Sequence, residues 1–181
     1  MGAGEKRRIR KSYDELGGKL YDERYELEQT SKYDAIIRHS AISTDDLVLD
    51  DGCATGRLLE RLHSWGIGID ISSSLLSTAL SRLRKFAHAF LIQADAEHLP
   101  LRCHIFEKVF AVTVIQNNPK PELAFREMGR VVRVGSEVIV TALKKSFTSQ
   151  GFRQLIAASG FTLKYFIEDE GLKDWIAFMT I

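Results

Sequence analysis

Strand-like and helical runs alternate along most of the chain, and this alternation constrains the fold more than any other feature of the sequence. Short apolar runs rich in β-branched residues, which are typical of buried strands, are separated by amphipathic runs with helical spacing. Strands are expected at residues 46–50, 67–71, 89–95, 108–116 and 137–143. Repeated strand–helix units favour a mostly parallel sheet covered by helices on both faces, so we predict a three-layer α/β fold.

The C-terminal stretch departs from this alternation. Residues 161–169 and 172–181 are both strand-like, and no helical run separates them. Two consecutive strands joined by a short loop predict a hairpin, which adds one antiparallel strand to the sheet. With the five strands above, the expected sheet has seven strands.

Residues 1–40 are expected to form a charged, helical N-terminal lid segment ahead of a domain expected at residues 41–181. Residues 12–40 have helical character, and the pair Gly17-Gly18 predicts a break or kink. The basic run EKRRIRK is expected to be a solvated, flexible tail rather than an RNA-binding arm. Tyr13, Tyr21 and Tyr25 are interleaved with charges, and two alternatives stay open for them. They either pack on the sheet or belong to a lid over a ligand site.

The turn after the first expected strand has the spacing D-x-G-x-A-x-G, from Asp50 to Gly56. Small residues let a backbone approach a ligand closely, and the following helix points its N–H groups at the same place. Ligands bind at the carboxyl ends of the strands in an open parallel sheet. Arg57 stands where a dinucleotide fingerprint has its third glycine, so that class is disfavoured. The carboxylate of Asp50 beside the turn would repel a diphosphate and attract a cation.

Acidic residues also close the next two strands. Asp70 ends the second strand, and its carboxylate is suited to accept hydrogen bonds from two ribose hydroxyls. Asp95 ends the third strand, in QADAEHLPL. Asp51 has two equal alternatives, a ligand role or a residue that faces solvent or caps the turn. Cys53 is expected to fill space, with its backbone mattering more than its sulfur.

These motifs, in this order, resemble those of the class I (Rossmann-like) S-adenosylmethionine-dependent methyltransferases. AEHLPL and REMGRVVRVG resemble the small-molecule and quinone-type (methyltransferase type 11-like) branch most closely. The resemblance implies a Rossmann-like methyltransferase fold, S-adenosyl-L-methionine as cofactor, S-adenosylhomocysteine as its product, and methyl transfer to an unidentified acceptor. The residues expected to bind the cofactor are Tyr13, Tyr21, Asp50, Gly52, Cys53, Ala54, Gly56, Asp70, Ile71, Asp95, Ala96 and Gln116.

The segment VIQNNPKP follows the fourth strand at the mouth of the expected cleft. It partly resembles the Asn-Pro-Pro-aromatic motif of methyltransferases that modify amino groups, but the second proline and the aromatic are absent. Position makes Gln116, Asn117 and Asn118 the candidates for substrate contact, and Asn117 and Asn118 are the expected catalytic residues. No side chain stands out as a general base.

Composition excludes several classes of protein. The formal charge is +1, from 25 basic and 24 acidic residues, which argues against a nucleic-acid coat. No apolar stretch is long enough to span a membrane. The cysteines and histidines lack metal-ligand spacing, so no metal is expected. A cytoplasmic location is the expectation. The sequence does not distinguish a small molecule from RNA or protein as the methyl acceptor. It does not predict the oligomeric state either. The alternative function is an inactive methyltransferase-like scaffold.

Overall fold

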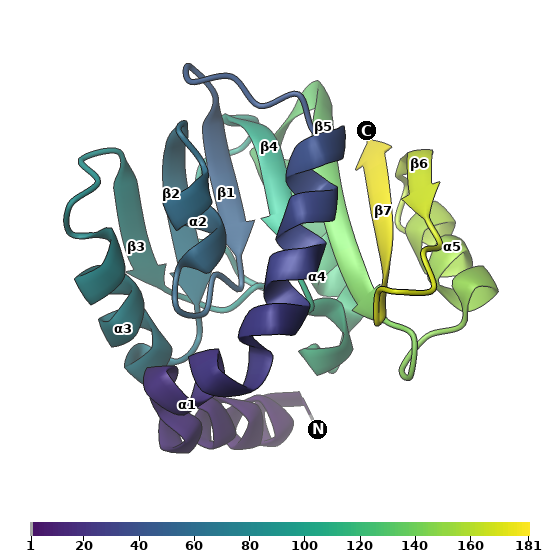
Figure 1. Cartoon of the computed structure of the whole chain (residues 1–181). Coiled ribbons are helices and arrows are strands. Elements are labelled where there is room, and N and C mark those ends of the chain that lie inside the picture. Colours follow the sequence, from purple (N-terminus) through teal and green to yellow (C-terminus); the bar gives the residue numbers. More distant parts are fainter. Residues whose placement is uncertain (1) are drawn as a thin grey trace.

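The computed structural model describes residues 2–181 and contains one seven-stranded sheet (Figure 1). The strands are β1 Leu47–Asp51, β2 Trp65–Asp70, β3 Ala89–Gln93, β4 Phe106–Ala111, β5 Val132–Leu143, β6 Thr162–Ile167 and β7 Asp174–Thr180. Their order is β3-β2-β1-β4-β5-β7-β6. Neighbouring strands are parallel from β3 to β5, whereas β7 runs antiparallel to both β5 and β6. The predicted seven-stranded α/β sheet with its C-terminal hairpin is confirmed.

Helices cover both faces of this sheet. They are α1 Gly2–His39, α2 Arg57–Arg61, α3 Ser73–Leu83, α4 Pro121–Val131 and α5 Ser149–Ala158, with a short 3₁₀ helix, η1, at Ile115–Asn117. One core contains Phe125 of α4 and Phe152 of α5, and the other contains Ile36 of α1 and Leu58 of α2. Because successive strand residues face opposite sides, most strands contribute to both cores, whereas β2 contributes Ile67 and Ile69 to the first core only.

The predicted helix boundaries have clear chemical causes. Ser72 is the N-cap of α3, and its side chain accepts the N–H of Leu75 at 3.2 Å. Pro121 opens α4, where a missing N–H carries no cost. Gly160 follows α5 with a φ of 83°, a left-handed conformation that ends a helix. Local sequence therefore determined these boundaries, as expected.

The fourth strand is shorter than predicted. Residues 108–116 are rich in β-branched side chains, but β4 ends at Ala111. The N–H of Thr113 donates to the side-chain oxygen of Thr141, at 2.9 Å, and Thr113 has a φ of 62°. The chain then turns into η1. A tertiary hydrogen bond and a left-handed residue thus override the β propensity of this run.

The N-terminal segment is helical throughout residues 2–39, apart from a kink at Gly17, which has a φ of 70° and a ψ of 157°. The expected kink is confirmed, but the expected flexible tail is wrong. Residues 5–11 are helical because Lys6 and Ile9 contact the domain, which stabilises that turn. The part of α1 after the kink packs on the sheet through Tyr33 and Ile36. In the described range, no helix is both long and apolar enough to cross a membrane.

Candidate functional site

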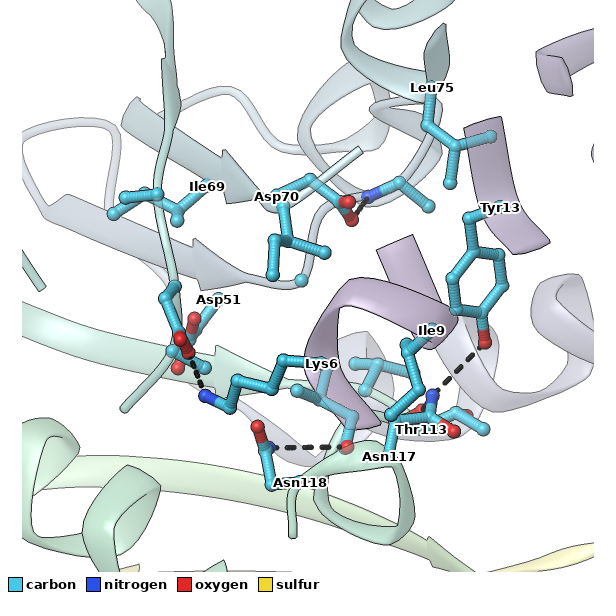
Figure 2. Close-up of a pocket in the computed structure, with 18 of the residues that line it drawn as sticks. Lys6, Ile9, Tyr13, Asp51, Ile69, Asp70, Leu75, Thr113, Asn117 and Asn118 are labelled. Carbon is cyan, nitrogen blue, oxygen red and sulfur yellow. Dashed lines mark hydrogen bonds and ion pairs between the residues drawn. The ribbon is translucent and has the colours of Figure 1, made fainter. Parts of the chain in front are cut away.

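A cavity lies at the carboxyl ends of β1, β2 and β4, where the strand order reverses between β1 and β4 (Figure 2). Ligands bind at this point in open parallel sheets. Ten of the expected site residues line it: Tyr13, Tyr21, Gly52, Ala54, Asp70, Ile71, Asp95, Ala96, Asn117 and Asn118. Four others lie outside its lining: Asp50, Cys53, Gly56 and Gln116.

The turn after β1 is held against β2 by two backbone hydrogen bonds. The N–H groups of Gly52 and Cys53 both donate to the carbonyl oxygen of Ile69, at 2.7 and 2.8 Å. Gly52 has a φ of 86°, and a Cβ there would lie 2.2 Å from a methyl carbon of Val114. The backbone conformation and the contact with Val114 both require glycine at this position.

Asp70 organises the wall of the cavity that β2 forms. Its two carboxylate oxygens accept the backbone N–H groups of Ala54 and Ser72, at 2.9 and 2.8 Å. Ala54 has a φ of 47°, which alanine adopts less readily than glycine, and the bond to Asp70 helps to hold it there. Burial raises the pKa of Asp70, while these N–H groups oppose the rise. Each oxygen keeps a lone pair for a ligand hydroxyl.

Cys53 and Gly56 support the turn from behind. Cys53 is buried in the core on the α1 side of the sheet. Gly56 has a φ of 77°, and a Cβ there would lie 2.8 Å from a methyl carbon of Leu83 in α3. Gly56 therefore allows α2 to pack closely on α3. Neither residue lines the cavity, so their contribution to the site is the shape of the backbone.

Asp50 and Asp51 point to opposite faces of the sheet, as consecutive strand residues do. Asp51 lines the cavity, whereas Asp50 lies outside its lining and is buried. Burial, and then the charges of Asp51 and Asp70, raise the pKa of Asp50 to about 8. Sequence alone placed emphasis on Asp50, but the strand register brings Asp51 to the cavity.

Asp51 is a buried carboxylate that faces a cavity. Within residues 2–181, neither of its oxygens has a hydrogen-bond partner, and the side chain is 1% exposed. It therefore neither faces solvent nor caps the turn, which removes that alternative. Burial, followed by the charges of Asp70 and Asp95, raises its pKa to about 7. A buried carboxylate in this position favours a ligand that brings positive charge or hydrogen-bond donors.

Lys6 reaches into the same cavity from the first part of α1, as Figure 2 shows. Its ammonium forms ion pairs with Asp95 and with Glu97, the second at 3.0 Å. Asp95, Glu97 and His98 are close enough together to share a metal ion. The ammonium of Lys6 pairs with both carboxylates, and its single charge offsets one of their two negative charges.

Tyr13 joins the N-terminal helix to the loop after β4. The side-chain amide of Asn117 donates to the hydroxyl oxygen of Tyr13, at 3.0 Å, and Asn118 donates to the carbonyl oxygen of Val114, at 3.3 Å. Burial raises the pKa of Tyr13, so its hydroxyl keeps a proton to donate. Tyr13 and Tyr21 both line the cavity, which favours the ligand-site alternative over packing on the sheet. Gln116 lines a neighbouring cavity instead.

Sequence reasoning missed several residues of the lining, including Lys6, Ile9, Leu75, Thr113 and Val114. A signal existed for two of them. Lys6, Ile9 and Tyr13 are three and four residues apart, which places them on one face of a helix. Extending the helical pattern before residue 12 would have found that face. Thr113 and Val114 lacked such a signal, because their run was typical of a strand.

With this geometry established, comparison of the chain with known proteins identifies its class. The family described as "Methyltransferase domain" matches residues 49–140, which are 92 of the 181 residues. The chain therefore belongs to the family of S-adenosylmethionine-dependent methyltransferases. The matched region contains the turn after β1, Asp70, Asp95 and the loop after β4.

Among curated relatives, the malonyl-[acyl-carrier protein] O-methyltransferase of Marinomonas sp. is 31% identical over 163 residues, which cover 87% of this chain and 58% of that protein. A ubiquinone/menaquinone biosynthesis C-methyltransferase of Nitrosospira multiformis is 31% identical over 142 residues, which cover 71% of this chain and 58% of that protein. The chain spans about half the length of the curated relatives it matches.

Solved structures share the fold at low sequence identity. The magnesium protoporphyrin IX methyltransferase of Synechocystis PCC 6803, crystallised with bound S-adenosylmethionine, has a TM-score of 0.81 at 15% identity. The match covers 97% of this chain and 96% of that one. The Rossmann-like methyltransferase architecture predicted from the sequence is thereby confirmed.

The residues of the cavity fit this cofactor in chemical terms. Asp70 retains lone pairs that suit two vicinal hydroxyls. The buried carboxylate of Asp51, without a partner in residues 2–181, suits a ligand that carries net positive charge. The turn at Gly52 brings backbone rather than side chain to the cavity wall.

Proposed function

We propose that this chain binds S-adenosylmethionine in the cavity at the ends of β1, β2 and β4 and catalyses transfer of its methyl group to an acceptor. The observation that carries the proposal is Asp70. Its carboxylate fixes the turn at Ala54, and it also lines the cavity beside the unsatisfied carboxylate of Asp51. We propose the expected cofactor-binding residues that line this cavity as the binding set, with Asp51 and Lys6 added to it. Asp50, Cys53 and Gly56 are proposed to act from behind the turn, and Gln116 lines the neighbouring cavity.

The chain's own contribution to catalysis is alignment and exclusion of water. When bound, S-adenosylmethionine supplies a methyl group that its sulfonium already activates for transfer. Tyr13, Asn117 and Asn118 lie where the cavity meets the loop after β4, and we propose that they position the acceptor. Alignment of two reactants can supply roughly 7–11 kcal/mol of a barrier. A base is needed only for an acceptor that must lose a proton.

Titration calorimetry with S-adenosylmethionine, S-adenosylhomocysteine and NAD tests the cofactor. We expect the first two to bind at one site per chain and NAD not to bind. Transfer of a labelled methyl group into fractionated cell extract tests activity and identifies the acceptor. Binding without transfer into any fraction would favour the inactive scaffold, and no binding of either adenosyl compound would refute the methyltransferase function.

We further propose that residues 2–16, the part of the N-terminal segment before the Gly17 kink, act as a lid over the cofactor. Lys6 and Ile9 lie in the cavity, and the space that remains is about 80 Å³. Ligand pockets typically measure about 300–1,000 Å³. Entry of the cofactor therefore requires this part of α1 to move. Gly17 provides the hinge, since its backbone already departs from helical geometry.

Hydrogen exchange distinguishes a lid from a static packing helix. The amides of residues 5–16 should exchange faster in the free protein than with saturating S-adenosylhomocysteine, because a lid belongs to the least stable part of a fold. Tyr33 and Ile36 lie on the later part of the same helix and pack in the hydrophobic core. Their amides provide the internal control and should be protected in both states. Equal, high protection of residues 5–16 in both states would contradict the lid.

A further inference from the structure

A second cavity adjoins the first and has a different charge. It measures about 680 Å³, within the range of about 300–1,000 Å³ that is typical of ligand pockets. Tyr13, Tyr21, Thr113 and Asn117 line both cavities, so these residues form the boundary between them. A ligand in this cavity would meet a ligand in the first cavity at that boundary.

Basic side chains dominate the lining of this second cavity. Arg24, Lys144, Lys145 and Lys173 line it, against a single acidic residue, Glu28. Glu28 already pairs with two lysines, Lys173 at 2.9 Å and Lys32 at 3.2 Å, and its pKa is lowered as a result, despite partial burial. The lining therefore holds positive charge that its one carboxylate does not neutralise.

Three of these cations are available to a ligand. Among residues 2–181, Arg24, Lys144 and Lys145 form no ion pair within 4.0 Å. Lys144 is positioned by its bond to the carbonyl oxygen of Asp169, at 2.7 Å, and by the ring of Trp175, whose centre lies 4.7 Å from the ammonium. Neither partner is an anion, so the positive charge of Lys144 is not neutralised by these contacts. Cations gathered in a concave site favour an anionic ligand.

The boundary between the two cavities is held at Thr113 by a buried, charge-balanced network. The ammonium of Lys32 is buried and contacts Thr113, at 2.5 Å, and Asp174, at 3.1 Å. Thr113, at the boundary between the cavities, is held in its left-handed conformation by this network and by Thr141. Because Asp174 balances Lys32, the network positions the boundary without cancelling the surplus charge of Arg24, Lys144 and Lys145.

Two amide side chains in the lining have unsatisfied oxygens. Gln29 is 4% exposed, and neither its Oε1 nor that of Gln116 has a hydrogen-bond partner in residues 2–181. The amide nitrogen of Gln116 donates to the carbonyl oxygen of Thr113, at 2.6 Å, which fixes the orientation of this side chain. Its oxygen therefore calls for an O–H or N–H donor.

We propose that this second cavity binds the methyl acceptor, and that the acceptor is a small molecule carrying a carboxylate or phosphate and an O–H or N–H group. Arg24, Lys144 and Lys145 bind the anion, and Gln116 accepts the donor near the boundary with the cofactor cavity. This inference rests on the proposed function for the place of transfer, but the charge of the cavity can be tested separately. A cavity of about 680 Å³, lined by α1 and the loops after β4 and β5, has the size of a small-molecule site, which favours a small molecule over RNA.

The test uses the full chain saturated with S-adenosylhomocysteine and three probes: 3-hydroxybenzoate, 3-hydroxybenzamide and 3-hydroxyphenyl phosphate. Calorimetry should show binding of one or both anions, which separates carboxylate from phosphate recognition. The neutral amide should bind at least about tenfold more weakly, the loss expected when one charged hydrogen bond is removed. Equal affinity for the amide and both anions would overturn the proposal.

Charge reversal locates the binding site. Lys145→Glu and Arg24→Glu should each weaken anion binding by about tenfold or more and leave the affinity for S-adenosylhomocysteine unchanged. Lys164→Glu, on the exposed surface of β6, is the matched control and should leave both unchanged. Unchanged anion affinity in both cavity variants would overturn the proposal, as would binding of unfractionated RNA in place of the small anions. If S-adenosylhomocysteine itself fails to bind, the proposed function falls, and the anion titrations still decide the charge of the cavity.

Discussion

Replacement of Asp70 by alanine should weaken the binding of S-adenosylmethionine by roughly ten- to a hundredfold. Hydrogen bonds to charged groups contribute about 1.5–3 kcal/mol each, and we propose that Asp70 accepts those of the ribose hydroxyls. The structure adds a second cause. Alanine would also remove the acceptor for the N–H groups of Ala54 and Ser72, so the turn would lose the bond that holds Ala54 at its φ of 47°.

Calorimetry on folded variants tests this expectation. Asp70→Asn keeps one acceptor oxygen and should lose less affinity than Asp70→Ala. Asp45→Ala is the matched control, because Asp45 is an exposed aspartate in the loop before β1 and lies outside the cavity lining. An unchanged dissociation constant in a folded Asp70→Ala protein would remove Asp70 from the site.

The parts of this fold that could be predicted from the sequence depend on local chemistry. The strand–helix alternation, the Ser72 cap, the kink at Gly17 and the C-terminal hairpin all follow from patterns a few residues long. The acidic strand ends were predictable for the same reason. Once strands are parallel, their carboxyl ends meet at one edge, so Asp70 and Asp95 were expected to lie close together, and both line the cavity.

The parts that could not be predicted depend on contacts between distant segments. Lys6 meets Asp95 across 89 positions of sequence, and nothing local marks either residue for the other. Thr113 leaves the sheet because of Thr141, which belongs to β5. The roles of Asp50 and Asp51 depend on which face of β1 looks toward the cavity, and that face is set by the packing of the whole sheet.

Asp50→Asn should stabilise the free protein at alkaline pH. The pKa of Asp50 is raised from 3.8 to about 8 by burial and by the charges of Asp51 and Asp70. The folded state therefore holds this proton more tightly than the unfolded state. The stability it contributes is complete below about pH 4 and is lost as the pH rises to about 8. Asparagine cannot ionise, so the variant should be more stable above pH 8 by on the order of 6 kcal/mol, since the shift from 3.8 to about 8 corresponds to about 1.4 kcal/mol for each pKa unit.

Thermal unfolding of the wild-type protein and the Asp50→Asn variant between pH 4 and pH 9 measures this difference. Asp45→Asn, at an exposed position, is the control and should show no pH-dependent change in stability relative to wild type. The Asp50→Asn variant also tests whether Asp50 contributes to cofactor binding, although its side chain lies outside the cavity lining. A functional carboxylate is maintained at the expense of stability, so the variant should bind S-adenosylmethionine more weakly while unfolding at a higher temperature. The cationic cofactor favours an ionised Asp50 behind the turn, and asparagine removes that attraction. Higher stability with unchanged affinity would exclude Asp50 from cofactor binding, and a melting temperature that differs equally from wild type at every pH would contradict the raised pKa.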